Sequence, residues 1–379
     1  MFRGFSVGRD PRSRRQINGA FGKRSLQSIP ICCGGMDVGK IDFQKKFVQA
    51  WLLDPKENFN RKSLTFEIRK DPLTGHPSRI LPFRRRLPET RIPTELIEGS
   101  RKGCPFCPDQ IDGFTPRFIP EIAPEGRIQK GRAVLFPNSF PYARHNWVVA
   151  LTEDHFLQLD QFTNEILRDG FLVAREGIER VERMDPGVIY SSINCNYLPQ
   201  AGGGLFHPHF QVVAEEEPSA KHAAVLEGLK QYQRDWGSFF WEDCLSEERK
   251  IGERYIGGYG NVHFWAAFSP LGILGEIIIV FTNRPTVHDV ATKDWVDFSE
   301  GLLRIFRYLI DSRVVSFNLS LYSGTREDAR SWVYARLCPR TAMPPWSTSD
   351  INYFEKLHDE VICVMSPEDL CKEVKPYFG

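Results

Sequence analysis

The chain has 379 residues, of which 41% are apolar and 26% charged, and its formal net charge is +1. This length is sufficient for two domains or for one large duplicated fold. The near balance of 49 basic and 48 acidic residues argues against a dedicated nucleic-acid-binding protein. The apolar runs, such as residues 276–281, are strand-sized, and none approaches the roughly 20 residues that cross a bilayer. We therefore expect a globular protein with neither a nucleic-acid nor a membrane partner.

Residues 1–35 differ in composition from the rest of the chain. They hold seven Arg or Lys against one Asp, with little apolar periodicity. Transit peptides are Arg- and Ser-rich and poor in acids, but a disordered basic tail or a translation start at Met36 explains the segment equally simply, and we favour these two. The nine cysteines are an odd number and most are isolated, which indicates a reducing, cytoplasmic compartment.

From about residue 60 onward, short apolar runs alternate with turn residues, which predicts strands joined by loops. A long amphipathic helix is predicted over 154–183, because its apolar residues recur at helical spacing. The strands are expected in residues 62–86 on both sides of a turn at 71–75, in two runs within 131–155, in 187–197 and in 206–215.

The same order of elements recurs downstream. Strands are predicted in 261–283, 313–324 and 331–340, with an amphipathic helix within 287–312. An internal repeat of this kind predicts the α+β class, with a duplicated fold of two repeats, each an antiparallel sheet with a helix. We place the first repeat at 60–217, a helical connection at 218–254, and a diverged second repeat at 255–379.

A CxxC motif occurs in GCPFCP, residues 103–108. In a reducing compartment, Cys104 and Cys107 form either a redox pair or half of a zinc site. Zinc takes four ligands, and without a second CxxC the other two would be histidines. The residues alone leave zinc and a metal-free, reduced CxxC equally open. The candidate histidines are His145, His155, His207 and His209.

The stretch GGGLFHPHFQVVAE, residues 202–215, places two histidines two apart after three glycines. If FHPHFQ is extended, His207, His209 and Gln211 point to one face; the alternative is an exposed strand with incidental histidines. Glycine backbone N–H groups approach anions closely, and a neutral imidazole attacks phosphorus as a nucleophile. A glutamine amide two residues on would stabilise the phosphoryl oxygens. The pattern therefore predicts phosphoryl or nucleotidyl transfer.

Four stretches together resemble the galactose-1-phosphate uridylyltransferase family of the histidine-triad superfamily. Their order and spacing agree with the family over about residues 60–217, and the internal repeat agrees with its duplicated fold. The stretches are RKDPLTGHPSRILPFRRR, GCPFCP, VLFPNSFPY and FHPHFQ.

The resemblance implies a reaction and a role for each matched residue. His209 would attack the α-phosphorus of a nucleoside-diphosphate sugar, and the nucleotidyl-histidine would pass its nucleotide to a sugar 1-phosphate, with ping-pong kinetics. Gln211 would bind the phosphoryl oxygens, and Arg84 would reach the phosphates across a homodimer interface. A structural zinc ion would be held by Cys104, Cys107, His155 and His207. The residues expected at the nucleotide and its phosphates are Arg84, Phe106, Asn138, Phe140, Val148, Asn196, Gly202, Gly203 and Gly204.

The sequence also departs from the family pattern. Gly204 stands where the family carries a phosphate-binding serine, and Leu87 where it carries an arginine. Tyr334 and Arg336 replace a second His-x-His pair, so we expect no second metal site. Because the second repeat takes part in sugar recognition in the family, inorganic phosphate or water are alternative acceptors, giving a phosphorylase or a hydrolase. A non-catalytic nucleotide-binding protein is a further alternative.

Overall fold

The computed structural model describes residues 40–84, 92–325, 328, 330–343 and 348–379. The expected basic tail at 1–35 lies outside these residues, and so does Leu87. Two sheets and a two-stranded ribbon make up the β-structure of this part of the chain.

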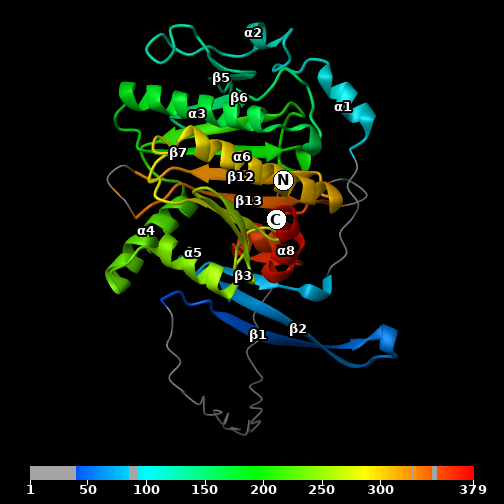
Figure 1. The fold of residues 1–379 in the computed structure, drawn as a ribbon. Coiled ribbons are helices and arrows are strands. Elements are labelled where there is room, and N and C mark those ends of the chain that lie inside the picture. Colours follow the sequence, from blue (N-terminus) through cyan, green and yellow to red (C-terminus); the bar gives the residue numbers. More distant parts are fainter. Residues whose placement is uncertain (1–39, 85–91, 326–327, 329, 344–347) are drawn as a thin grey trace, which may run out of the picture. The chain divides into compact units, whose positions relative to one another are not determined.

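A ten-stranded antiparallel sheet carries both repeats (Figure 1). At its centre a strand of the first repeat pairs with a strand of the second, β7 with β12, so the two repeats share one sheet. This arrangement confirms the predicted α+β class and the duplication. In spatial order the strands are β4 (Ile128–Lys130), β5 (Ala133–Pro137), β6 (His145–Ala150), β8 (His209–Glu215), β7 (Tyr190–Tyr197), β12 (Ser316–Tyr322), β13 (Tyr334–Arg340), β11 (Ile277–Phe281), β10 (Val262–Ala266) and β9 (Tyr255–Tyr259).

One face of this sheet is covered by the two long helices, α3 (Asn164–Met184) and α6 (Thr292–Asp311), which lie side by side in Figure 1. Their apolar stripes form the main core. In it, Phe171 of α3 stacks on Phe210 of β8 at 4.6 Å between ring centroids and on Trp295 of α6 at 5.3 Å. Aromatic pairs at such separations add to the stabilisation from burial.

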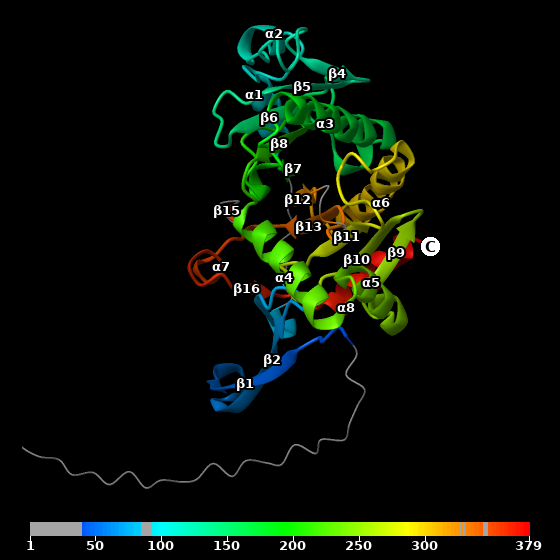
Figure 2. The same cartoon turned by 90° about the vertical axis from the view of Figure 1, so that its left-hand side faces the viewer.

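In the second repeat the opposite face is covered by α4 (Ala220–Trp236) and α5 (Phe240–Ile251). Trp241 of α5 packs on Tyr334 and Trp265, whose strand neighbours Ala335 and Phe264 face the main core. Because side chains alternate across a strand, α5 lies on the side away from α3 and α6. Figure 2 shows α4 and α6 on opposite sides of β12 and β13. In the first repeat this face is left for other residues, including His209 and Gln211.

The predicted start of the first long helix is wrong by ten residues. Thr163 caps α3, its hydroxyl accepting a hydrogen bond from the Ile166 N–H at 3.3 Å, and the helix proper begins at Asn164. Residues 154–163 form a loop with a 3-10 turn at Leu159–Gln161. The loop residues Leu157, Leu159 and Phe162 are buried, so the spacing of these apolar residues resembles that of the apolar face of a helix.

The smaller sheet has the order β1-β2-β3-β16, with β16 parallel to β3. Its first strand was not predicted. The remaining elements are β1 (Lys45–Asp54), β2 (Asn60–Lys70), β3 (Pro77–Ile80), β16 (Val361–Cys363), the ribbon β14 (Ala342–Met343) and β15 (Thr348–Ser349), the helices α1 (Thr94–Arg101), α2 (Ile111–Phe114), α7 (Tyr353–His358) and α8 (Pro367–Val374), and the 3-10 turns Pro55–Glu57, Pro82–Arg84, Pro199–Ala201 and Lys375–Tyr377.

Candidate active site

A row of polar side chains crosses the centre of the large sheet on the face away from α3 and α6. Register places Gln211 of β8 opposite Asn194 of β7, Asn194 opposite Ser320 of β12, and Ser320 opposite Arg336 of β13. Residues directly opposite in neighbouring strands share a face. On the other side Gln211 pairs with Val148 of β6, where the row becomes apolar.

His209 begins β8 and has one ring nitrogen free. Its Nδ1 lies 2.7 Å from the backbone carbonyl oxygen of His207. A carbonyl oxygen only accepts, so Nδ1 carries the proton and Nε2 keeps its lone pair. Burial lowers the pKa of His209, which keeps the ring neutral. The side chain therefore has the protonation state and tautomer that a nucleophile requires.

An apolar wall stands beside His209. The ring of Phe106, from the CxxC turn, lies 5.4 Å from the His209 ring and 5.3 Å from Phe136, between centroids. Phe136, Val148 and Ala150 form a small buried cluster against which Phe106 packs. The structure thus brings Phe106 and Val148, two of the expected nucleoside contacts, to the histidine.

The loop between β5 and β6 carries the other two expected nucleoside contacts. Asn138 donates a hydrogen bond to the side-chain oxygen of Asn146 at 2.7 Å, and the side chain of Phe140 is 86% exposed. From the same loop, the Tyr142 hydroxyl donates to the side-chain oxygen of Gln211. Sequence reasoning missed Tyr142, although it closes the stretch VLFPNSFPY.

The three glycines before the histidines differ in what they allow. Gly202 has φ +85°, in the left-handed region that favours glycine. A Cβ at Gly203 would lie 2.6 Å from the backbone oxygen of Asn196, whereas a Cβ at Gly204 would meet nothing within 4 Å. Gly203 is thus required sterically beside Asn196, and Gly204 is not. Arg84 ends a 3-10 turn, and its side chain lies outside the described part of the structure.

The four expected metal ligands meet in one buried cluster. One ligand atom from each of Cys104, Cys107, His155 and His207 lies within 4.8 Å of all the others. The Cys107 Sγ is 3.4 Å from Nδ1 of His155 and 3.9 Å from Nδ1 of His207. The cluster joins the CxxC turn, the β6–α3 loop and the residue two before His209.

Hydrogen bonds at the far nitrogens orient both imidazoles toward the sulfurs. Nε2 of His207 donates to the Thr152 carbonyl oxygen at 2.8 Å. The Ser100 hydroxyl donates its single hydrogen to the Ile97 carbonyl, so it accepts from Nε2 of His155 at 2.8 Å. Nδ1 of each ring therefore presents its lone pair to the cluster, as second-shell partners of metal sites do.

The donor set fits a zinc ion. Burial lowers the pKa of His207 to about 4 and also lowers that of His155, so both rings are neutral ligands. Burial, and then Cys104, raise the pKa of Cys107 to about 11, and a bound cation would favour the thiolate instead. Two sulfurs and two imidazoles are a set that tetrahedral zinc accepts. The buried cluster could hold such a metal.

In the second repeat, aromatic rings and an ion pair occupy the corresponding strand. Tyr334 stacks on Tyr322 at 4.9 Å between centroids, and His222 packs on both rings. Arg336 is paired with the fully buried Glu276, at 2.5 and 2.9 Å. Across the described ranges, the Cys104 cluster is the single group of convergent metal-binding side chains.

No family model matches the chain. An uncharacterized protein of Archaeoglobus fulgidus is 32% identical over 314 residues, which are 82% of this chain and 91% of the relative. The two proteins belong to one family. An ADP-glucose phosphorylase from Arabidopsis thaliana, solved with bound ADP-glucose, superposes with a TM-score of 0.63 at 19% identity, covering 82% of this chain and 98% of the other.

A GalT-like protein from the same plant has a TM-score of 0.62 at 19% identity, over 81% of this chain and 98% of the other. A uridylyltransferase structure has a TM-score of 0.59 at 18% identity, over 82% and 98%. The chain has the galactose-1-phosphate uridylyltransferase fold. No helix in the described residues of this fold is both long and apolar enough to cross a membrane.

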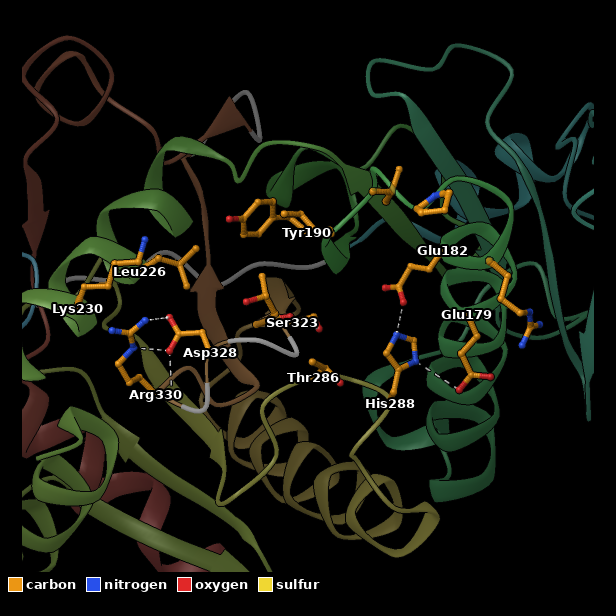
Figure 3. Close-up of a pocket in the computed structure, with 16 residues that line it drawn as sticks. Glu179, Glu182, Tyr190, Leu226, Lys230, Thr286, His288, Ser323, Asp328 and Arg330 are labelled. Atoms are coloured by element: carbon orange, nitrogen blue, oxygen red, sulfur yellow. Dashed lines mark hydrogen bonds and ion pairs between the residues drawn. The ribbon is translucent and has the colours of Figure 1, made fainter.

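The large cavity of the structure lies away from His209 and from the Cys104 cluster. It has a volume of about 840 Å³ and lies at the start of β7, near Tyr190 (Figure 3). Asn196 is near the end of β7, and His209 begins the neighbouring strand β8. The charged groups of the cavity largely bind one another, as His288 does with Glu182 at 2.8 Å and Glu179 at 3.5 Å. The lining of this cavity includes neither His209 nor any residue of the Cys104 cluster.

Proposed function

We propose that the protein is a nucleotidyltransferase that takes the nucleotidyl group of a nucleoside-diphosphate sugar onto His209. The observation that carries the proposal is the tautomer of His209. Nδ1 is bonded to the carbonyl oxygen of His207, so Nε2 is left unprotonated beside an apolar wall. A neutral imidazole held in one orientation is a competent nucleophile toward phosphorus.

The first step exchanges one bond to the α-phosphorus for another. Nε2 of His209 attacks, the P–O bond to the sugar phosphate breaks, and the sugar 1-phosphate leaves with the bonding electron pair. The new P–N bond leaves a positive charge on the ring, and Nδ1 keeps its proton in the hydrogen bond to the His207 carbonyl. That carbonyl thereby stabilises the cationic nucleotidyl-histidine.

The second step reverses the chemistry with a different acceptor. An oxygen of an acceptor phosphate attacks the phosphorus, the P–N bond breaks, and its electron pair returns to Nε2. In both steps charge develops on the non-bridging phosphoryl oxygens. Gln211 and Asn196 present amide groups beside His209, so these are the proposed stabilising donors. The N–H groups of Gly202 and Gly203 already donate to the carbonyl oxygens of Pro199 and Leu198, at 2.9 and 3.0 Å, so among the three glycines we propose the N–H of Gly204 as the phosphate donor.

The cluster of Cys104, Cys107, His155 and His207 would hold zinc with a structural role. When bound, zinc links the CxxC turn to the residue that carries the His209 hydrogen bond. Through that turn it also fixes Phe106, whose ring lies against both histidines, at 5.9 Å from His207 and 5.4 Å from His209.

The donor class draws support from the similar structures, among them an ADP-glucose phosphorylase with bound ADP-glucose and a uridylyltransferase. We propose a sugar 1-phosphate as the acceptor. One observation favours inorganic phosphate as a second candidate: Arg336, the cation of the second repeat's polar row, is already neutralised by buried Glu276. With phosphate as acceptor the protein would be a nucleoside-diphosphate-sugar phosphorylase.

Trapping of the intermediate tests this proposal. The protein is incubated with UDP-glucose or ADP-glucose labelled at the α-phosphate, and the reaction is quenched in base, in which a phosphoramidate survives. We expect label on His209, lost in His209→Asn and retained in His145→Asn, since His145 is bound to Asp185 at the far end of β6. Turnover is then compared with galactose 1-phosphate, with inorganic phosphate and with neither.

Each outcome has a distinct reading. Turnover that requires a sugar 1-phosphate indicates a transferase, and turnover that requires inorganic phosphate indicates a phosphorylase. Turnover in the absence of both acceptors indicates a hydrolase. The absence of label with every donor tested sinks the proposal. Nucleotide-dependent shifts in melting temperature without turnover would then indicate a binding protein.

A further inference from the structure

An asparagine of the second repeat bonds directly to an asparagine of the candidate active site. Asn318 of β12 lies opposite Asn196 of β7, and its Nδ2 donates to the side-chain oxygen of Asn196 at 2.7 Å. The same Nδ2 donates to the backbone oxygen of Ala201 at 2.9 Å, just before the glycines. Cys195, which precedes Asn196 in β7, donates from its thiol to the backbone oxygen of His209 in the adjacent strand β8 at 3.6 Å, so Asn196 is close to the proposed nucleophile.

The orientation of the Asn318 amide is chemically fixed. Its side-chain oxygen accepts from Nη1 of Arg340 at 2.5 Å, and its nitrogen donates to the Ala201 carbonyl. A guanidinium only donates and a carbonyl oxygen only accepts. Rotating the amide by 180° would set nitrogen against donor and oxygen against acceptor, so one orientation is favoured.

Arg340 is itself held in place. Its Nε donates to Asp350 at 2.7 Å and its Nη2 to the Ser349 hydroxyl at 2.8 Å. Arg340 and Asp350 are both buried, at 9% and 6% exposure, and the second oxygen of Asp350 accepts from the Thr341 N–H at 3.1 Å. A buried, hydrogen-bonded ion pair has few alternative arrangements. The anchor is therefore rigid.

The fixed Asn318 amide determines which part of the Asn196 side chain is available to a ligand. Because the oxygen of Asn196 accepts from the Asn318 donor and Asn196 is exposed, its NH₂ group is the part of the amide that remains to donate to a ligand. An NH₂ group offers hydrogen bonds to an anion, whereas the amide oxygen would repel it. The polarity of Asn196 is thus set by the second repeat.

We propose that Asn318 is a positioning residue for nucleotidyl transfer, acting through Asn196. It holds the Asn196 amide with its donors toward the phosphoryl oxygens that gain charge during attack by His209. This inference rests on the proposed function. It assigns the second repeat a part in the reaction that does not involve contact with the substrate.

The test removes the Nδ2 donor of Asn318, which serves both Asn196 and the Ala201 carbonyl. Asn318→Asp keeps the shape and the Arg340 contact but loses the donor to Asn196. The rate of His209 labelling is measured by rapid quench at increasing donor concentration, in the wild type, Asn318→Asp, Asn196→Ala and the double variant. The matched control is Asn164→Asp, which removes another cross-repeat donor, from Nδ2 to the Val296 carbonyl at 2.9 Å, far from the site.

We expect Asn318→Asp to lower the saturating rate of labelling about tenfold or more, with a smaller change in the half-saturating donor concentration. In the Asn196→Ala background the same change should cost less than about twofold, because residues acting through one another are non-additive. Asn164→Asp should label at the wild-type rate. If Asn318→Asp fails to fold, Asn318→Ala carries the same comparison, with an expected loss of about threefold to tenfold.

The results separate the two proposals. Wild-type labelling with an unchanged rate in the folded Asn318 variant overturns the positioning role and leaves the proposed function standing. An undiminished loss in the Asn196→Ala background also overturns it, since Asn318 would then act by another route, such as the Ala201 carbonyl. No labelling in the wild type overturns both.

Discussion

His209 donates its Nδ1 proton to the backbone carbonyl of His207, 2.7 Å away, while the His207 side chain turns into the cysteine cluster. The two histidines thus have different surroundings although they are two residues apart. β8 begins only at His209, so the expected shared strand face holds for His209 and Gln211 and does not extend to His207. We expect the cluster to control the reacting residue through the backbone.

Zinc content provides the first prediction. The purified protein should contain about one zinc per chain, and Cys104→Ser should lose most of it, because zinc binds a three-ligand site with an introduced hydroxyl poorly. The melting temperature should fall with it, since binding energy of a structural metal is folding energy. Metal analysis by mass spectrometry and a thermal melt measure both.

Cys244→Ser is the matched control for the zinc prediction. This cysteine is equally buried, in α5, and lies outside the cluster. It should keep the metal, whatever its effect on stability. A folded wild-type preparation without zinc would contradict the expectation, as would equal zinc loss in both variants.

The glycine run gives a paired prediction. Gly203→Ala should destabilise the protein by about 1–3 kcal/mol, because its Cβ would lie 2.6 Å from the Asn196 backbone oxygen. It should also slow labelling of His209 by displacing Asn196. Gly204→Ser should leave stability unchanged, since nothing lies within 4 Å of a Cβ there. Chemical denaturation and base-quench labelling of the two variants decide the matter, and equal effects would refute this reading.

A third prediction concerns Tyr142, whose hydroxyl donates to the Gln211 side-chain oxygen. Tyr142→Phe removes this bond and allows the Gln211 amide to rotate. Because Tyr142 is 68% exposed, the melting temperature should not change. The saturating labelling rate should fall about twofold to tenfold, the usual worth of one hydrogen bond. A wild-type rate would show that Gln211 is oriented without Tyr142.

Sequence patterns identified candidate residues within local motifs but did not identify the residues that surround them in the fold. The CxxC and His-Pro-His motifs are local, so they marked Cys104, Cys107 and His207 as candidates. The residues alone left the choice among four histidines open, and His155 was selected only by the resemblance to the family. Asn318 and Arg340 carry no such signal. Asn318 is 122 residues from Asn196, and only the pairing register of β7 with β12 brings them together.

Two parts of the fold show the limits of periodicity. β1 is exposed along nearly its whole length, so no alternation of apolar and polar residues marks it as a strand. Conversely, the loop before α3 buries Leu157, Leu159 and Phe162, which made its pattern look helical. The repeat itself was readable because α3 and α6 each cover the same kind of sheet face with a long apolar stripe.

The last prediction concerns pH and His288, which links the β11–α6 loop to α3 (Figure 3). Burial opposes protonation, but Glu182 and Glu179 together raise the pKa of His288 above its usual 6.5. Charged groups near this pair include Arg175, which contacts Glu179 at 3.4 Å, Asp289, which accepts from Thr286, and Arg183, which lines the same cavity as His288.

The direction of the pH dependence follows from the coupling of protonation to folding. A histidine whose pKa is raised by folding contributes stability that is fully present below pH 6.5 and is lost as pH rises through the folded value. The contribution of His288 to the melting temperature should therefore decline by a few degrees as pH rises from 6 to 8. The buried His207, His222 and His263, whose pKa values burial lowers to about 4, act in the opposite direction and are common to the variants compared. Glu182→Gln should flatten this decline, because it removes the carboxylate at 2.8 Å. Glu176→Gln should not, since Glu176 lies nearly two turns earlier on α3 and is bound to Arg180. Equal pH slopes in wild type and Glu182→Gln would show that His288 is neutral in the folded protein.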